Sequence, residues 1–322
     1  MLDFGTTHTV VAIGREPRVV REPSRIALKP GEPGTPPQQN KSNGQGHSPD
    51  RVWVRPVECG RVVNSYAMES LLKNILEETR SGFRLMTLRR VAGVIAPPNL
   101  SEDERSNLRA MMVDLGFGKV HMISEPFASA RGLNLDVSDA RGRAVVDLGG
   151  GTTTTSVFSM GGLVNWHQEP SGGRLVDQTI AEYIRARYLV DVPFGLSEEI
   201  KIKLGSLHPQ EKPAKFSFKG IESVSRLPKN INLDDNEIRD VMVDAFENLV
   251  RGIQRGLERL PPELAGDIAR EKILLIGGGA KTPGLIRFLE ERLGLEFEVA
   301  ADPENITVMG ARVLMSSGLM DA

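Results

Sequence analysis

The stretch that most constrains this chain is residues 143–166, RAVVDLGGGTTTTSVFSMGGLVNW. Its first residues, up to Asp147, are typical of a buried strand, and the threonine-rich run after the glycines is typical of a returning strand. Glycines let backbone N–H groups approach phosphate oxygens, threonine hydroxyls can donate further hydrogen bonds, and an acid can hold a metal-bound water. We therefore predict a hairpin that binds phosphate and magnesium, with a tight hairpin lacking any ligand as the alternative. The residues assigned to it are Asp147, Gly149, Gly150, Gly151, Thr152 and Thr153.

Two further stretches share this chemistry. Residues 3–9, DFGTTHT, repeat the pattern of an acid followed by glycine and threonine, so the chain is predicted to consist of two similar halves. Near the C-terminus, the strand-like run 273–276 leads into Gly277, Gly278 and Gly279 and then into a predicted helix over 285–293. A buried strand, a glycine-rich turn and a helix N-terminus form a corner that suits a nucleotide.

Strand–helix alternation along the chain predicts an α/β fold with helices on both faces of the sheet, and 322 residues leave room for two domains. A formal net charge of −2 gives no global reason to expect nucleic-acid binding. The single cysteine, Cys59, excludes an intramolecular disulfide framework and fits a reducing compartment. Because the start has no signal-peptide pattern and no apolar run reaches spanning length, we expect a cytoplasmic protein.

Two segments are unusual in composition. Residues 29–50 are rich in proline, glycine, glutamine, asparagine and serine and lack any large apolar residue, so we predict a flexible loop. In residues 80–90, Leu85 and Met86 stand among apolar side chains that alternate with arginines. This pattern fits a short connector leading into a strand, and it equally fits an exposed apolar tip for an anionic membrane surface.

Glu125 follows a predicted strand and precedes a predicted helix. An acid at the mouth of such a turn can face a ligand held by the hairpins, so Glu125 is the candidate base that orients an attacking water. The alternative is an ordinary charge at a helix terminus.

The order and spacing of four motifs resemble the superfamily of actin, sugar kinases and heat-shock chaperone ATPases. These motifs are the first hairpin at 3–9, the turn at 125–130, the second hairpin at 147–153 and the corner at 276–285. Within the superfamily the chain is most similar to the MreB family of bacterial actins, because segments 54–60, 124–130, 198–206 and 226–229 also resemble MreB segments in the same order.

The resemblance implies an actin-like ATPase fold, with two similar α/β domains around a cleft for ATP and Mg²⁺. Domain I would comprise residues 1–146, with the loop 29–50 replacing its small subdomain. Domain II would comprise residues 147–300, with a small subdomain at about 190–235. Residues 301–322 would form a C-terminal helix that returns to domain I.

The resemblance also implies roles for individual residues. Asp3 and Asp147 would organise magnesium through water, Thr6, Thr7 and the loop 149–153 would bind phosphate, and Glu125 would orient the hydrolytic water. The remaining assignments are Glu198 and Lys201 at the ribose and adenine, Gly277, Gly278 and Gly279 at the adenosine, and Leu85 and Met86 at the membrane. One departure from the family pattern is His8, which stands where the family has asparagine.

The function implied by the resemblance is a cytoplasmic ATPase that polymerises with itself into paired protofilaments. These filaments would lie on the inner face of the membrane and act with proteins of cell shape and cell-wall synthesis. Hydrolysis and polymerisation could both be weak here, since the loop 29–50 replaces a subdomain that makes filament contacts in the family. The alternative is a non-polymerising ATP-binding regulator or a small-molecule kinase of the same superfamily.

Overall fold

The computed structural model describes residues 1–14, 18–35, 51–78, 90–192, 195–258 and 260–318. Most of the predicted flexible loop, and the predicted membrane residues Leu85 and Met86, lie outside the described residues.

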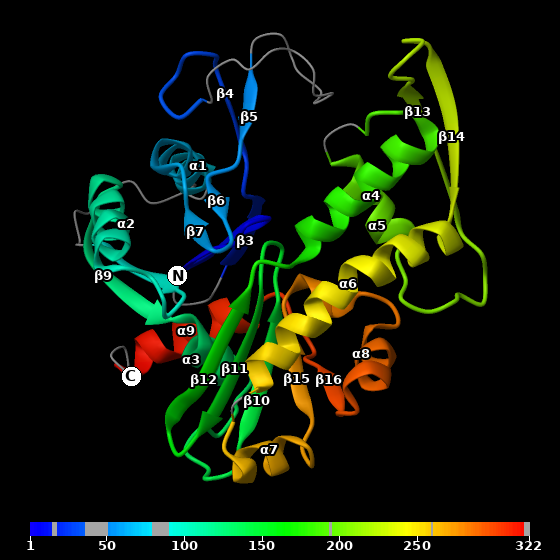
Figure 1. Ribbon diagram of the computed structural model, residues 1–322. Coiled ribbons are helices and arrows are strands. Elements are labelled where there is room, and N and C mark those ends of the chain that lie inside the picture. The colour runs from blue at the N-terminus through cyan, green and yellow to red at the C-terminus, as the bar shows by residue number, and fades with distance from the viewer. Residues whose placement is uncertain (15–17, 36–50, 79–89, 193–194, 259, 319–322) are drawn as a thin grey trace.

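Two five-stranded mixed sheets form the framework (Figure 1). They have the same strand order. In both, a central strand pairs antiparallel with the strand that follows it and parallel with a strand that arrives much later in the chain. The first sheet has the order β3-β2-β1-β8-β9, with β1 Leu2–Phe4, β2 His8–Ile13, β3 Arg18–Pro23, β8 Arg90–Ala96 and β9 Phe117–Ser124. The second has the order β12-β11-β10-β15-β16, with β10 Arg143–Leu148, β11 Thr153–Ser159, β12 Gly162–Glu169, β15 Ile273–Ile276 and β16 Phe297–Val299. The strand-by-strand match confirms the predicted pair of similar halves.

Helices cover both faces of the first sheet, as the α/β prediction requires. Because successive side chains of a strand point to opposite faces, Leu2 and Phe4 of β1 lie on the same face of the sheet. There they pack in one core with α1 (Ser65–Glu78) and α2 (Glu102–Asp114). The opposite face of the sheet packs against α3 (Glu125–Gly132) and α9 (Ile306–Ser317). Ser101 caps α2 in a capping box with Glu104, which explains why that helix begins there.

The helices α3 and α9 also link the two halves, because they lie between the sheets (Figure 1). Ala128 of α3 packs into the core of the first sheet, and Ala130 packs against Val145 and Phe158 of the second. The other face of the second sheet carries the largest core, with α4 (Gly173–Tyr188), α6 (Asp235–Leu257) and α8 (Leu285–Leu293).

Each half carries a small lobe. In the first half, β4 (Ile26–Leu28) pairs with β5 (Val52–Val54), and β6 (Val57–Glu58) pairs with β7 (Arg61–Val62), beside α1. In the second, α5 (Leu196–Leu204) packs with the hairpin of β13 (Lys215–Ile221) and β14 (Pro228–Asp234). The short helices α7 (Pro262–Ile268) and η1 (Gly278–Lys281) complete the elements. None of the helices in the described ranges is both long and apolar enough to cross a membrane.

Candidate functional site

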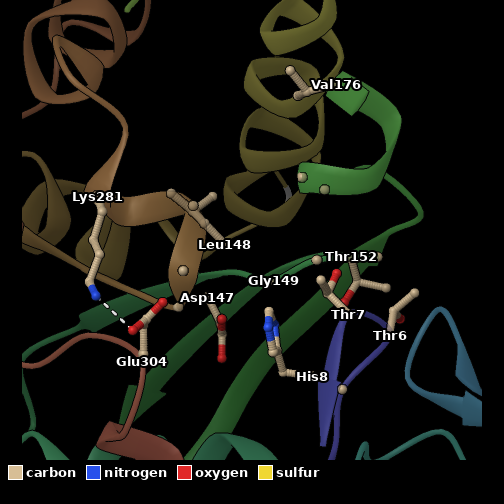
Figure 2. A pocket seen from close by; sticks show the side chains of 18 of the residues that line it. Thr6, Thr7, His8, Asp147, Leu148, Gly149, Thr152, Val176, Lys281 and Glu304 are labelled. Carbon is tan, nitrogen blue, oxygen red and sulfur yellow. Dashed lines mark hydrogen bonds and ion pairs between the residues drawn. The ribbon is translucent and has the colours of Figure 1, made fainter. Parts of the chain in front are cut away.

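A cavity of about 510 Å³ lies where the two halves meet, and both contribute to its walls. The first half contributes the turn after β1, and the second contributes the turn after β10 (Figure 2). The predicted site residues that line it are Asp3, Thr6, Thr7, Glu125, Asp147, Gly149, Gly150, Gly151, Thr152, Glu198, Lys201, Gly277, Gly278 and Gly279. The structure therefore brings together residues that the sequence places in five separate segments.

The glycines between β10 and β11 allow the two turns to approach each other closely. A Cβ on Gly150 would overlap the side chain of Thr7, and a Cβ on Gly151 would overlap that of Thr6. Any larger residue would therefore separate the turns and widen the cavity between them. The hydroxyl oxygen of Thr6 is held in place, since it accepts a hydrogen bond from the backbone N–H of Gly60 at 3.3 Å.

Thr153 differs from the other residues assigned to the hairpin in where its side chain lies. Its side chain is buried, does not line the cavity, and donates a hydrogen bond to the Ser171 carbonyl at 2.7 Å. Because strand residues alternate between faces, the first residue of β11 points away from the cavity. Thr153 stabilises the turn that leads into α4.

Three carboxylates share the floor of the cavity: Asp3 on β1, Asp147 on β10 and Glu125 at the first position of α3. Burial raises the pKa of Asp3 to about 6, although Arg21 opposes the rise. Burial and then the charge of Asp3 raise the pKa of Asp147 to about 7, against a hydrogen bond from Thr307. Burial followed by the charges of Asp147 and Asp3 raises the pKa of Glu125 to about 8. Like charges in a shared, poorly solvated space disfavour simultaneous ionisation.

The position of Glu125 follows from a direct transition between two elements. Strand β9 ends at Ser124, and α3 begins with Glu125 and Pro126, so the carboxylate stands at the carboxyl end of a parallel strand. In open α/β sheets this edge is where ligands bind. Glu125 is thus more than a charge at a helix terminus, since it faces two other acids across a cavity.

The cavity walls beyond the three acids are formed by α5, α6 and the turn after β15. Lys201 reaches into the cavity from α5, but its ammonium group already pairs with Asp177 at 2.7 Å and donates to the Gly173 carbonyl at 3.1 Å. Gly277 has a positive φ of 83° and packs against Asp147, where a Cβ would overlap the carboxylate. An apolar wall is supplied by Met242, Ala245, Phe246 and Leu249 of α6.

The lining residues that were not predicted as site residues include His8, Arg21, Glu304 and Thr307. Arg21 donates to the Glu304 carbonyl at 2.9 Å, and the Glu304 carboxylate pairs with Lys281 at 2.6 Å. No local pattern marks these contacts, because Arg21 and Glu304 lie 283 positions apart in the chain. His8 is different, since its place inside the first glycine–threonine turn was a signal that could have identified it.

The acid floor suits a hard cation that keeps its water ligands. Within the described ranges, no group of at least three His, Cys, Asp or Glu side chains is arranged to hold a metal directly. The mutual repulsion of Asp3, Glu125 and Asp147 would nevertheless be relieved by a cation held through water, as Mg²⁺ prefers when it is bound with phosphates.

Comparisons with known proteins agree with this geometry. The family described as MreB/Mbl protein matches residues 1–319. The cell shape-determining protein MreB of Escherichia coli strain K12 is 30% identical over 315 residues, covering 96% of this chain and 90% of that protein. The cell shape-determining protein Mbl of Bacillus subtilis strain 168 is 27% identical over 318 residues, covering 98% and 95%.

Solved structures show the same fold. The crystal structure of MreB5 of Spiroplasma citri bound to AMPPNP matches with a TM-score of 0.87 and 27% identity, covering 99% of this chain and 96% of that chain. A double helical filament of MamK matches with a TM-score of 0.76 at 17% identity, covering 98% and 97%, which is a similarity of fold alone.

Proposed function

We propose, from the premise that this chain belongs to the MreB/Mbl family of actin-like proteins, that it binds and hydrolyses ATP. We propose further that it assembles into membrane-associated filaments that act in cell shape and cell-wall synthesis. A relative of the same family, MreB5 of Spiroplasma citri, has been solved with AMPPNP and with ADP, which supports a nucleotide as the ligand of the cavity.

The observation that carries the proposal is the pair of glycine–threonine turns, one from each half, that border one cavity above three acids. Backbone N–H groups of glycine-rich turns and threonine hydroxyls are donors that suit phosphate oxygens. Thr6, Thr7 and Thr152 would therefore hold the phosphates, with the backbone of Gly149, Gly150 and Gly151 beneath them. Glu198, Lys201 and the turn 277–279 would hold the nucleoside.

Asp3 and Asp147 would hold magnesium through its water ligands. When bound, Mg²⁺ neutralises charge on the phosphates and orients them for displacement. The two carboxylates come from equivalent strands of the two halves, so this arrangement also joins the halves across the cavity.

Glu125 would orient the attacking water and accept its proton. A carboxylate can do this only when it is ionised, and burial, followed by the charges of Asp147 and Asp3, raises the pKa of Glu125 to about 8. A cation held by Asp3 and Asp147 would offset the part of this rise that comes from their charges. Such a cation would therefore favour the ionised form of the base.

Polymerisation and membrane contact are proposals that follow from the family. The protein would assemble with itself into paired protofilaments, and Leu85 and Met86 would insert into the inner face of the cytoplasmic membrane. The protein would then be cytoplasmic and peripherally attached, with cell-wall synthesis or shape proteins as further partners.

The test is sedimentation and electron microscopy of the purified chain with MgATP, MgADP or no nucleotide, with and without anionic liposomes. Filaments that need MgATP and gather on lipid are expected. Gly150→Val serves as the matched variant, because the added side chain would collide with Thr7 and block the phosphate site. A protein that stays monomeric at high concentration under all these conditions would overturn the filament proposal and favour a regulator or a small-molecule kinase.

A further inference from the structure

His8 is the first residue of β2, and its ring points into the cavity beside Thr7 and on the side of Asp147 (Figure 2). Among the described residues, no hydrogen bond or ion pair holds this ring, and none joins it to Asp3 or Asp147. A polar side chain aimed into a ligand cavity without a partner is available to the ligand.

The basic side chains of the cavity wall are already engaged. One arginine and two lysines line the cavity within the described ranges. Arg21 donates a hydrogen bond to the Glu304 carbonyl, and Lys281 pairs with the Glu304 carboxylate. Lys201 pairs with Asp177. These three side chains would therefore offer little additional positive charge to a bound polyphosphate. The imidazole of His8 is the one lining group of the described residues that can change from neutral to cationic near neutral pH.

The surroundings of His8 favour its neutral form. Burial, followed by the charge of Arg21 on the neighbouring strand β3, lowers its pKa, and Arg25 acts in the same direction. Glu198 of α5 and Glu304 ahead of α9 oppose this, but they do not outweigh it. The acids Asp3, Glu125 and Asp147 face the same cavity from β1, α3 and β10.

We propose that His8 binds the phosphate chain of the nucleotide and takes up a proton as the nucleotide enters, so that the cavity supplies this positive charge only when it is filled. The inference rests on the proposed nucleotide function and adds a residue and a proton to it. An asparagine at this position could donate a hydrogen bond but could not gain a charge. Nucleotide binding by this chain would then depend on pH in a way that an asparagine-bearing site would not.

The expected size follows from ordinary electrostatics. An opposite charge within about 4–6 Å raises the pKa of an imidazole by about 1–3. At pH 7 such a rise means uptake of a fraction of a proton per nucleotide bound, approaching about one for the largest rise. By linkage, the contribution of His8 strengthens nucleotide affinity as pH falls from 8 to 6, by at most about tenfold per pH unit.

The test is calorimetric titration of the full chain with MgADP at pH 7.0 in two buffers of different ionisation enthalpy, Pipes and Tris. The difference in heat gives the number of protons exchanged. The acids of the floor exchange protons too, so the wild type is compared with His8→Asn, which is expected to take up measurably fewer protons, by up to about one per nucleotide. His121→Asn, on β9 and outside the cavity lining, is the matched control and should behave as the wild type does.

A second measurement needs no variant. The NMR titration midpoint of the His8 ring in the wild-type protein should move to higher pH when MgADP is added. Tight MgADP binding with equal proton counts in the wild type and His8→Asn, or an unmoved midpoint, would overturn the role of His8 and leave the nucleotide function intact. No MgADP binding to the wild type would instead remove the nucleotide function.

Discussion

Replacing Asp147 with asparagine should stabilise the empty protein at alkaline pH. Burial and the charge of Asp3 raise the pKa of Asp147 from 3.8 to about 7. The folded protein therefore binds more protons than the unfolded chain between these values, and its free energy of unfolding falls as pH rises through that window. Asparagine has nearly the same shape, stays neutral, and can still accept the hydrogen bond from Thr307.

The magnitude follows from the pKa values. A pKa difference of about three corresponds to about 4 kcal/mol in the free energy of unfolding, at 1.36 kcal/mol for each pKa unit. This full effect is reached only when Asp147 is ionised in the folded protein. We therefore expect Asp147→Asn to exceed the wild type in stability by up to about 4 kcal/mol at pH 8 and by less than about 1 kcal/mol at pH 4. The assay is urea denaturation at both pH values with EDTA and without nucleotide.

Asp139 supplies a control of opposite sign. A hydrogen bond from Arg141 lowers the pKa of this half-buried carboxylate to about 2, so Asp139→Asn should not stabilise the protein at pH 8. Adding MgADP should make the wild type more stable than Asp147→Asn, because a ligand that binds only the folded wild type adds to its stability. Equal or lower stability of Asp147→Asn than wild type at pH 8 without ligand would refute the account of the acid floor.

Three more predictions test the other parts of the argument. Glu125→Ala should slow ATP hydrolysis by roughly 10²–10⁴-fold while MgATP binding persists, as judged by phosphate release and calorimetry; equal turnover would exclude Glu125 as the base. Replacing Leu85 and Met86 with glutamate should release the protein from anionic liposomes in co-sedimentation, and unchanged binding would leave these residues a connector. Phe158→Ala should lower the free energy of unfolding by about 3–5 kcal/mol, since this fully buried ring packs edge-on against Phe127 at 5.6 Å; a loss below about 1 kcal/mol would contradict that packing.

Local sequence chemistry predicted much of the framework. The strand over 273–276, the helix over 285–293 and the turns at 3–9 and 147–153 are found where they were expected. These signals depend on neighbours in the chain, such as a buried apolar run that ends in glycine. The sequence did not indicate where the Thr153 side chain lies, because strand pairing, which is a tertiary property, decides which face a residue occupies.

What the sequence determined by itself is the acid–glycine–threonine turn, because it depends on contacts a few residues apart, and the repetition of that turn indicated two similar halves. Only the tertiary structure decided that Asp3, Glu125 and Asp147 share one floor and that Arg21 meets Glu304 above it. Their perturbed pKa values arise from burial and from charges on distant segments. Such interactions depend on distances between residues in the folded structure, so the sequence pattern alone does not reveal them.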